Sequence, residues 1–238
     1  MEKIWLAEYK KTGIPESVAL PAENTSLVDI FERNFQKYGS RDAFIFMDKV
    51  LTFNELEVAS RKFATYLQSL NLAKGTRVAV MMPNVFQYPV VALGIFRAGL
   101  VLVNVNPLYT ARELDHQLND SGAEVLVIIE NFASVYQTIV GKTPVKHVVV
   151  ASVGDMLGTL KGTLVNFVLR KVRKQIPAWN IPGYTKFNAA LNSVNQSDYK
   201  RPSLTLSDTA VLQYTGGTTG VSKGAELTHG NLVANLLQ

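Results

Sequence analysis

Apolar and polar positions along this chain follow two rhythms, one typical of helices and the other of buried strands. Residues 26–39 and 52–75 each begin with a capping box, at Ser26 and at Thr52, and then carry apolar residues at helical spacing. Both segments are therefore predicted to be helices. Between them, residues 44–51 fit a small hairpin.

From residue 77 onwards, short apolar runs alternate with segments of helical spacing. Strands are predicted at residues 77–82, 100–105, 124–129, 145–150 and 209–213, and helices at residues 85–99, 110–122 and 131–140. Apolar strands that alternate with helices are typical of a mostly parallel sheet covered on both faces. The predicted fold class is therefore α/β.

One apolar stretch is long enough to be considered as a membrane span. Residues 78–96 form a run of 19 residues without a charge. Pro83, Asn84, Gln87 and Pro89 interrupt this run. The interruptions favour a strand, a turn and a helix, which is how a buried βα unit of a parallel sheet reads.

The net charge of +5 comes from one segment. Between Asp155 and Asp198 there is no acidic residue and there are six basic ones, and without these the chain holds 18 basic against 19 acidic residues. From Leu157 to Gln175, apolar residues recur at helical spacing and cations crowd the C-terminal end. Cations favour a helix C-terminus, so a solvated helix is one interpretation.

A basic amphipathic helix that contacts an anionic membrane surface is the sharper interpretation of the same segment. Nucleic-acid binding is a third, but the segment lacks interleaved aromatic residues, so we expect no nucleic-acid partner. The chain has no cysteine, which fits a reducing compartment and excludes a disulfide framework. We expect a cytoplasmic protein that is peripheral to the inner face of the cell membrane.

The expected organisation has four parts: an irregular lead-in over residues 1–24, an α/β core over 25–150, a basic amphipathic insert and loop over 151–208, and a strand, loop and helix start over 209–238. The last helix begins after Thr228 and meets no stop signal before Gln238. We therefore expect the chain to be part of a longer protein.

Residues 214–224 form the most informative stretch, with four glycines, three threonines and one lysine in eleven residues. Glycine amides approach a ligand closely, and hydroxyls and a lysine complement phosphate oxygens, whereas a plain surface turn needs neither. The Walker A pattern fails because Lys223 lies between Ser222 and Gly224, and the glycine spacing also fails the dinucleotide fingerprint. Both of those loops run into a helix, whereas this one is predicted between two strands.

This stretch resembles the signature loop of the adenylate-forming superfamily, which includes acyl-CoA synthetases, luciferases and the adenylation domains of peptide synthetases. Further stretches are similar to bacterial long-chain-fatty-acid–CoA ligases, and the resemblance covers nearly the whole chain. These stretches are residues 81–84, 87–89, 97–99, 103–110 and 118–123.

The resemblance implies a reaction in two steps with ATP, magnesium and CoA. ATP and a fatty acid give an acyl-adenylate and pyrophosphate, and CoA then displaces AMP. Carried over, Thr215 lies near magnesium, and the phosphate-binding residues are Tyr214, Thr215, Gly216, Gly217, Thr218, Thr219, Gly220, Val221, Ser222, Lys223, Gly224 and Ala225. The family's adenylating lysine belongs to later sequence, so no catalytic residue is assigned, and the chain alone is expected to be inactive.

Other functions stay open at this stage. The chain could be a non-catalytic nucleotide-binding or interaction module, or part of a related acyl- or aryl-CoA synthetase, and the resemblance leaves a homodimer open. His229 follows the predicted cap at Thr228, where a structural role is more common than catalysis. His116 and His147 are isolated, and no metal-ligand spacing links the three histidines.

Overall fold

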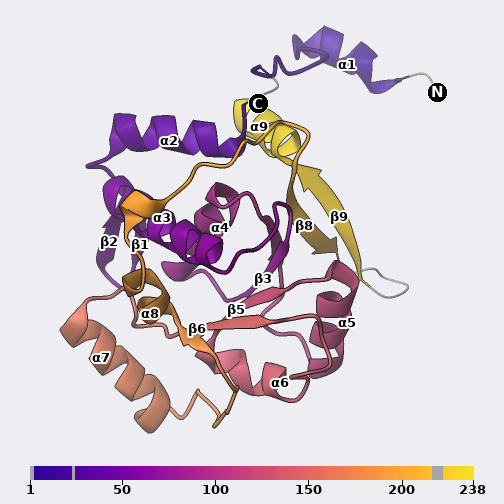
Figure 1. The fold of residues 1–238 in the computed structure, drawn as a ribbon. Helices are drawn as coiled ribbons and strands as arrows, with labels where there is room; N and C mark the ends of the chain where they lie inside the picture. Colours follow the sequence, from indigo (N-terminus) through magenta and orange to yellow (C-terminus); the bar gives the residue numbers. More distant parts are fainter. Residues whose placement is uncertain (1–2, 23–24, 216–221) are drawn as a thin grey trace.

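A computed structural model describes residues 3–22, 25–215 and 222–238 (Figure 1). Within these residues the main sheet has seven strands, in the order β7-β6-β5-β3-β4-β8-β9. Neighbouring strands run parallel except β8 and β9, which are antiparallel. The strands are β3 (Arg77–Met81), β4 (Val101–Asn104), β5 (Val125–Ile129), β6 (His147–Ala151), β7 (Thr185–Lys186), β8 (Thr209–Thr215) and β9 (Lys223–Thr228).

Helices cover both faces of this sheet, which confirms the α/β prediction (Figure 1). One apolar cluster includes residues of α2 (Leu27–Tyr38), α3 (Phe53–Ser69), α4 (Gln87–Arg97) and α8 (Phe187–Asn192). The other includes residues of α5 (Ala111–Ser121) and α6 (Ala133–Gln137), which follows the short 3₁₀ helix η1 (Glu130–Phe132). The sheet is therefore buried on both sides, because each face packs on its own helices.

Local sequence signals place most of these elements correctly. Ser26, Thr52 and Thr110 each form a reciprocal capping box with the acidic residue three positions later. The expected hairpin is β1 (Asp42–Phe46) and β2 (Lys49–Thr52). The last helix, α9 (His229–Leu237), begins as expected after Thr228.

The irregular lead-in expected over residues 1–24 is wrong in part, because Trp5–Thr12 form the helix α1. Lys11 pairs with Glu8 one turn earlier, and Gly13 adopts the left-handed conformation that ends the helix. The helix buries no residue and lies apart from the sheet (Figure 1). No side chain caps its N-terminus, so the start signal that marks helices such as α3 is missing here.

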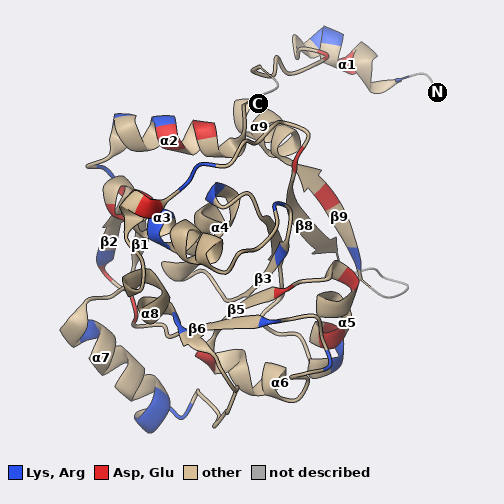
Figure 2. Cartoon of the chain, viewed as in Figure 1, with Lys and Arg blue, Asp and Glu red and all other residues tan. Residues whose placement is uncertain are grey.

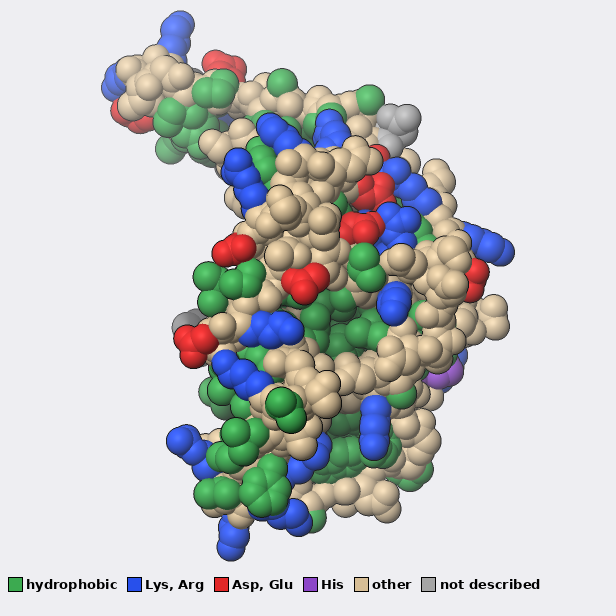
Figure 3. All heavy atoms as spheres, turned by 90° about the vertical axis from the view of Figure 1, so that its left-hand side faces the viewer, with side chains coloured by type: hydrophobic (Ala, Val, Ile, Leu, Met, Phe, Trp, Pro, Cys, Tyr) green, Lys and Arg blue, Asp and Glu red, His purple; other side chains and the backbone are tan. Residues whose placement is uncertain are grey.

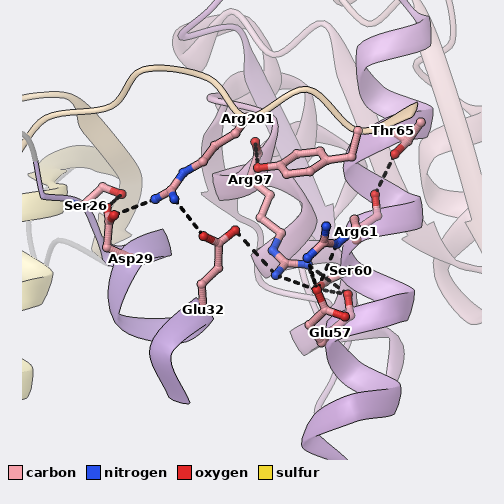
Figure 4. A network of polar contacts seen from close by, with 10 residues as sticks. Ser26, Asp29, Glu32, Glu57, Ser60, Arg61, Thr65, Arg97 and Arg201 are labelled. Carbon is pink, nitrogen blue, oxygen red and sulfur yellow. Dashed lines mark hydrogen bonds and ion pairs between the residues drawn. The ribbon is translucent and has the colours of Figure 1, made fainter. Parts of the chain in front are cut away.

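A network of ion pairs joins α2, α3 and α4 to the chain before β8 (Figure 4). The guanidinium of Arg97 is 2% exposed and lies 3.3 Å from a carboxylate oxygen of Glu57 and 3.7 Å from one of Glu32. Arg201 in turn contacts Asp29 and Glu32. The buried guanidinium of Arg97 on α4 therefore lies between the carboxylates of Glu32 on α2 and Glu57 on α3, and it holds the three helices together.

The segment after β6 contains α7 (Thr159–Phe167), which continues as a π-helical turn, η2 (Val168–Val172). Gly162 of α7 packs directly on the backbone of Gly154, leaving no room for a Cβ atom at either position. Asn166 accepts a hydrogen bond from the amide of Gly154 at 2.8 Å, and Arg170 pairs with the buried Glu130 at 2.7 Å. The small and polar side of α7 therefore faces the protein.

The apolar side of the same helix faces outward. Leu160, Leu164, Phe167 and Val172 are each more than half exposed. Lys and Arg are the charged residues on this segment, and hydrophobic and basic side chains gather over it in the space-filling view (Figures 2 and 3). Leu157 is an exception among the residues expected to face a membrane, because it packs into the core.

Within the described part of the chain, no helix combines the length and the apolar character needed to cross a membrane. The uncharged run over residues 78–96 forms β3, a turn and α4, which agrees with the prediction of a buried βα unit.

Candidate functional site

The glycine-rich stretch, residues 214–224, includes the last residues of β8 and the first residues of β9. β8 runs parallel to β4, with Gln213 opposite Asn104, so it ends at the carboxyl edge of the parallel strands. β9 returns antiparallel, with Lys223 opposite Thr215. Ligands of open α/β sheets bind outside the carboxyl ends of the strands, so this edge is the expected place for a site. The predicted setting between two strands is confirmed.

Half of the predicted phosphate-binding residues fall outside the described part of the chain. These are Gly216, Gly217, Thr218, Thr219, Gly220 and Val221. The structure places the residues on either side of them, which are Tyr214, Thr215, Ser222, Lys223, Gly224 and Ala225. The described geometry of the site is therefore that of its two ends, residues 214–215 and 222–225.

Tyr214, the first residue of the stretch, points toward α5. Its side chain is buried, and its hydroxyl donates a hydrogen bond to Asp120 Oδ2 at 2.5 Å. Burial raises the pKa of Tyr214, and the Asp120 carboxylate beside the hydroxyl raises it further. The hydroxyl is therefore protonated at neutral pH and acts as a donor to α5.

Gly224 packs against the ring of Tyr214. A Cβ atom at this position would lie 2.9 Å from Tyr214 Cε2, which is closer than real Cβ contacts. The two residues are opposite each other in the β8–β9 ladder. Gly224 is therefore required by packing within the hairpin, and this contact accounts for the last glycine of the stretch without a ligand.

Thr215 and Lys223 lie opposite each other and are both exposed. A hydroxyl and an ammonium group thus flank the two ends of the stretch at the sheet edge. Mg²⁺ keeps several of its waters and takes few protein oxygens besides those of phosphate, so one exposed threonine hydroxyl fits the ligand set that it uses with nucleotides. Among the described residues no cluster of three or more His, Cys, Asp or Glu side chains provides a metal site.

Sequence reasoning missed a chain of polar contacts along the same edge. Asn104, at the end of β4, accepts a hydrogen bond from the Tyr88 hydroxyl and donates one to Gln213 Oε1, both at 2.9 Å. Gln117 of α5 donates to the backbone carbonyl of Asn104 at 2.7 Å. A polar residue that ends an otherwise apolar strand is the signal that could have found Asn104.

The three histidines have separate surroundings. His229 is buried, its Nδ1 accepts from the amide of Leu27 at 3.3 Å, and its ring packs edge-on against Phe96. Burial lowers the pKa of His229, which favours the neutral ring that this hydrogen bond needs. His147 lies in β6, whereas His116 of α5 lies beside Ser222 at the end of the stretch.

These observations define a class of protein: an α/β domain whose parallel sheet leads, at its carboxyl edge, into a stretch of sequence rich in glycine and threonine and containing a lysine. The family model described as "AMP-binding enzyme" matches residues 31–238, and the chain belongs to this family. This confirms the resemblance to adenylate-forming enzymes, because the matched residues include the glycine-rich stretch.

Among curated proteins, the relatives of this chain include bacterial long-chain-fatty-acid–CoA ligases. The chain is 51% identical to a long-chain-fatty-acid–CoA ligase of Escherichia coli O157:H7, over all of this chain and 42% of that protein. It is 34% identical to a long-chain-fatty-acid–CoA ligase of Bacillus subtilis, over 98% of this chain and 41% of that protein. The chain thus spans about two fifths of the length of these relatives.

Solved structures give the same fold. A long-chain-fatty-acid–CoA ligase from Archaeoglobus fulgidus matches 93% of this chain and 40% of its own, with a TM-score of 0.72 and 27% identity. The anthranilate CoA ligase AuaEII, in complex with anthranoyl-AMP, matches 88% of this chain and 36% of its own, with a TM-score of 0.72 and 23% identity. At that lower identity, the second match supports the fold alone.

Proposed function

We propose that these residues form the N-terminal portion of an ATP-dependent acid–thiol ligase that activates long-chain fatty acids. The observation that carries the proposal is the 51% identity to a ligase of that kind along the entire chain. In the proposed reaction, a fatty-acid carboxylate attacks the α-phosphorus of ATP and pyrophosphate leaves. The thiol of CoA then attacks the acyl carbonyl, and AMP leaves as the thioester forms.

Within this reaction, the described residues have a limited part. Thr215 and Lys223 would contact the phosphates and the magnesium ion from the two ends of the glycine-rich stretch, since both side chains are exposed at the sheet edge. The residues between them, 216–221, would supply amides and hydroxyls to the phosphate oxygens. Phosphoryl chemistry of this type depends on positioning and on stabilising charge, which such groups provide. We also propose that the chain is organised as an α/β core over residues 25–150, a basic amphipathic insert and loop over 151–208, and a strand, phosphate-binding loop and helix start over 209–238.

The purified 238-residue chain is expected to release no pyrophosphate from ATP and oleate, since the resemblance places the adenylating lysine in later sequence. A chain of the relatives' full length that contains these residues is expected to form oleoyl-CoA. Pyrophosphate release by the 238-residue chain alone would contradict the first expectation. A full-length protein that prefers an aryl acid over a series of fatty acids would contradict the substrate class.

We also propose that residues 157–175 contact an anionic membrane surface, with the protein peripheral to the membrane. The specific support is the orientation of α7, whose apolar residues Leu160, Leu164 and Phe167 face outward while Gly162 and Asn166 face the protein. A solvated helix would be expected to show the opposite orientation. Apolar side chains bordered by cations match the interface of an anionic bilayer.

Changing Lys171, Arg173 and Lys174 together to Gln tests this contact in vesicle sedimentation. Each cation near an anionic surface contributes about 1 kcal/mol, so the triple variant should bind vesicles that contain phosphatidylglycerol about a hundredfold more weakly. Arg170 is left in place because it pairs with the buried Glu130. Salt should weaken binding of the unchanged protein.

A matched control removes the same number of cations elsewhere, at Lys3, Lys10 and Lys200, which are all exposed. This control should bind as the unchanged protein does, because those residues lie outside the α7 segment. Equal binding by the two triple variants would contradict the proposed contact.

A homodimer, the other partner considered, is tested by sedimentation velocity of the unchanged chain.

A further inference from the structure

One helix contacts both ends of the glycine-rich stretch. Asp120 of α5 accepts the hydrogen bond of the Tyr214 hydroxyl, one residue before the last residue of β8. His116, four residues earlier on the same helix, places Nε2 3.4 Å from the carbonyl oxygen of Ser222, one residue before β9. Residues four apart lie on the same helical face, so a single face of α5 meets both ends.

The helix that provides these contacts is itself held at several points. It begins at the Thr110–Glu113 capping box and ends at Gly122, which adopts the left-handed conformation. Leu114 and Leu118 bury completely against the sheet, and Gln117 donates to the backbone of β4. The backbone of α5 is therefore held firmly against the sheet. Its exposed side chains start from fixed positions, so they can hold another segment in place.

The contact at Tyr214 is shaped by packing as well as by its hydrogen bond. The ring is buried and fits against Gly224, where a Cβ atom would clash. Asp120 is exposed on α5, and a hydrogen bond to a carboxylate is stronger than one between neutral groups. Tyr214 is therefore held between β9 and α5.

We propose that α5 is a brace for the phosphate-binding stretch, in which Asp120 acts through Tyr214 and His116 acts through Ser222. The brace fixes the positions from which Thr215 and Lys223 reach the phosphates. Asp120, His116 and Tyr214 are positioning residues in this account. The consequence for nucleotide binding rests on the proposed function, whereas the brace itself does not.

Hydrogen exchange of the β8–β9 hairpin in the 238-residue chain tests the brace without any ligand. Asp120→Ala should speed exchange of the Thr215 and Lys223 amides about tenfold, which corresponds to the loss of one hydrogen bond of about 1.4 kcal/mol. Asp120→Asn keeps an acceptor and should restore most of the protection. His116→Leu should speed exchange at the Ser222 end, whereas His116→Gln keeps a donor for the carbonyl.

A control on the same helix is Asp115→Ala, because among the described residues the hydrogen bonds to Asp115 come from Asn119 of the same helix. This variant should leave exchange in the hairpin unchanged. A double-mutant cycle with Asp120→Ala and Tyr214→Phe should be non-additive, because the two residues act through one bond. Unchanged hairpin exchange in both Asp120→Ala and His116→Leu would overturn the brace.

Calorimetry with ATP and magnesium separates the brace from the proposed function. If the brace positions the phosphate contacts, Asp120→Ala should raise the Kd for Mg·ATP while the circular-dichroism spectrum of the unliganded chain stays that of the unchanged protein. If the unchanged chain binds no Mg·ATP but the variants still expose the hairpin to exchange, the brace stands and the proposed function of the stretch fails. An unaltered Kd, in a chain that binds, would overturn the positioning role.

Discussion

Replacing Arg97 with Gln is expected to lower the free energy of unfolding by about 3 kcal/mol, the largest effect on stability that we anticipate. The Arg97 side chain is 2% exposed, and it neutralises Glu57 and Glu32 from within the junction of α2, α3 and α4. Its Nη1 also donates to the carbonyl of Glu57 at 2.9 Å. Removing the guanidinium leaves these acceptors without their buried partner.

The control for this variant lies in the same network. Arg61 also pairs with Glu57, but its side chain is 37% exposed, so Arg61→Gln should cost no more than about 1 kcal/mol. For a protein of this size, a loss of about 3 kcal/mol corresponds to a fall of about 6 to 12 °C in Tm. Thermal unfolding of both variants measures the difference. Equal losses at the two positions would contradict the assignment of Arg97 as the buried centre of the network.

Changing Thr215 to Val and Lys223 to Gln together is expected to raise the Kd for Mg·ATP about a thousandfold. Each side chain is proposed to make a charge-assisted contact with phosphate or its magnesium ion, and such contacts contribute about 1.5 to 3 kcal/mol each. Both side chains are exposed, so the change should leave folding intact. Calorimetric titration with Mg·ATP, next to a circular-dichroism spectrum, measures both effects.

Two further variants make the interpretation specific. Lys223→Arg keeps the positive charge and should retain most of the affinity. Lys186→Gln removes one charge from β7, the strand at the opposite edge of the sheet, and should change nothing. If Lys186→Gln weakens binding as much as Lys223→Gln does, the effect of Lys223 comes from net charge and the proposed phosphate contact is wrong.

The fold could be predicted from sequence because its signals are local. Capping residues such as Thr52 and Thr110 satisfy backbone amides of their own helices. A continuous apolar run such as residues 125–129 indicates a buried strand without any knowledge of the residues that pack on it. The two-residue strand β7 could not be predicted, since so short a strand depends on its pairing with β6. Helix α1 was missed because it buries no side chain.

The site was predictable in its composition and less so in its geometry. The glycines, threonines and lysine of residues 214–224 indicate phosphate binding by residue type alone. That Tyr214 faces Asp120 depends on the packing of β8 against α5, which are about 90 residues apart in sequence. The orientation of α7 likewise depends on the contact of Gly162 with Gly154. Helical spacing shows that the helix has an apolar face, but not whether that face points to the core or to the surface.

The most direct test of the central claim is calorimetry of the unchanged 238-residue chain with three ligands in the presence of magnesium: ATP, pyrophosphate and adenosine. If the chain holds phosphate through the stretch between β8 and β9, ATP and pyrophosphate should bind with similar affinity and adenosine should give no heat. A folded circular-dichroism spectrum with no heat from ATP or pyrophosphate would contradict the claim.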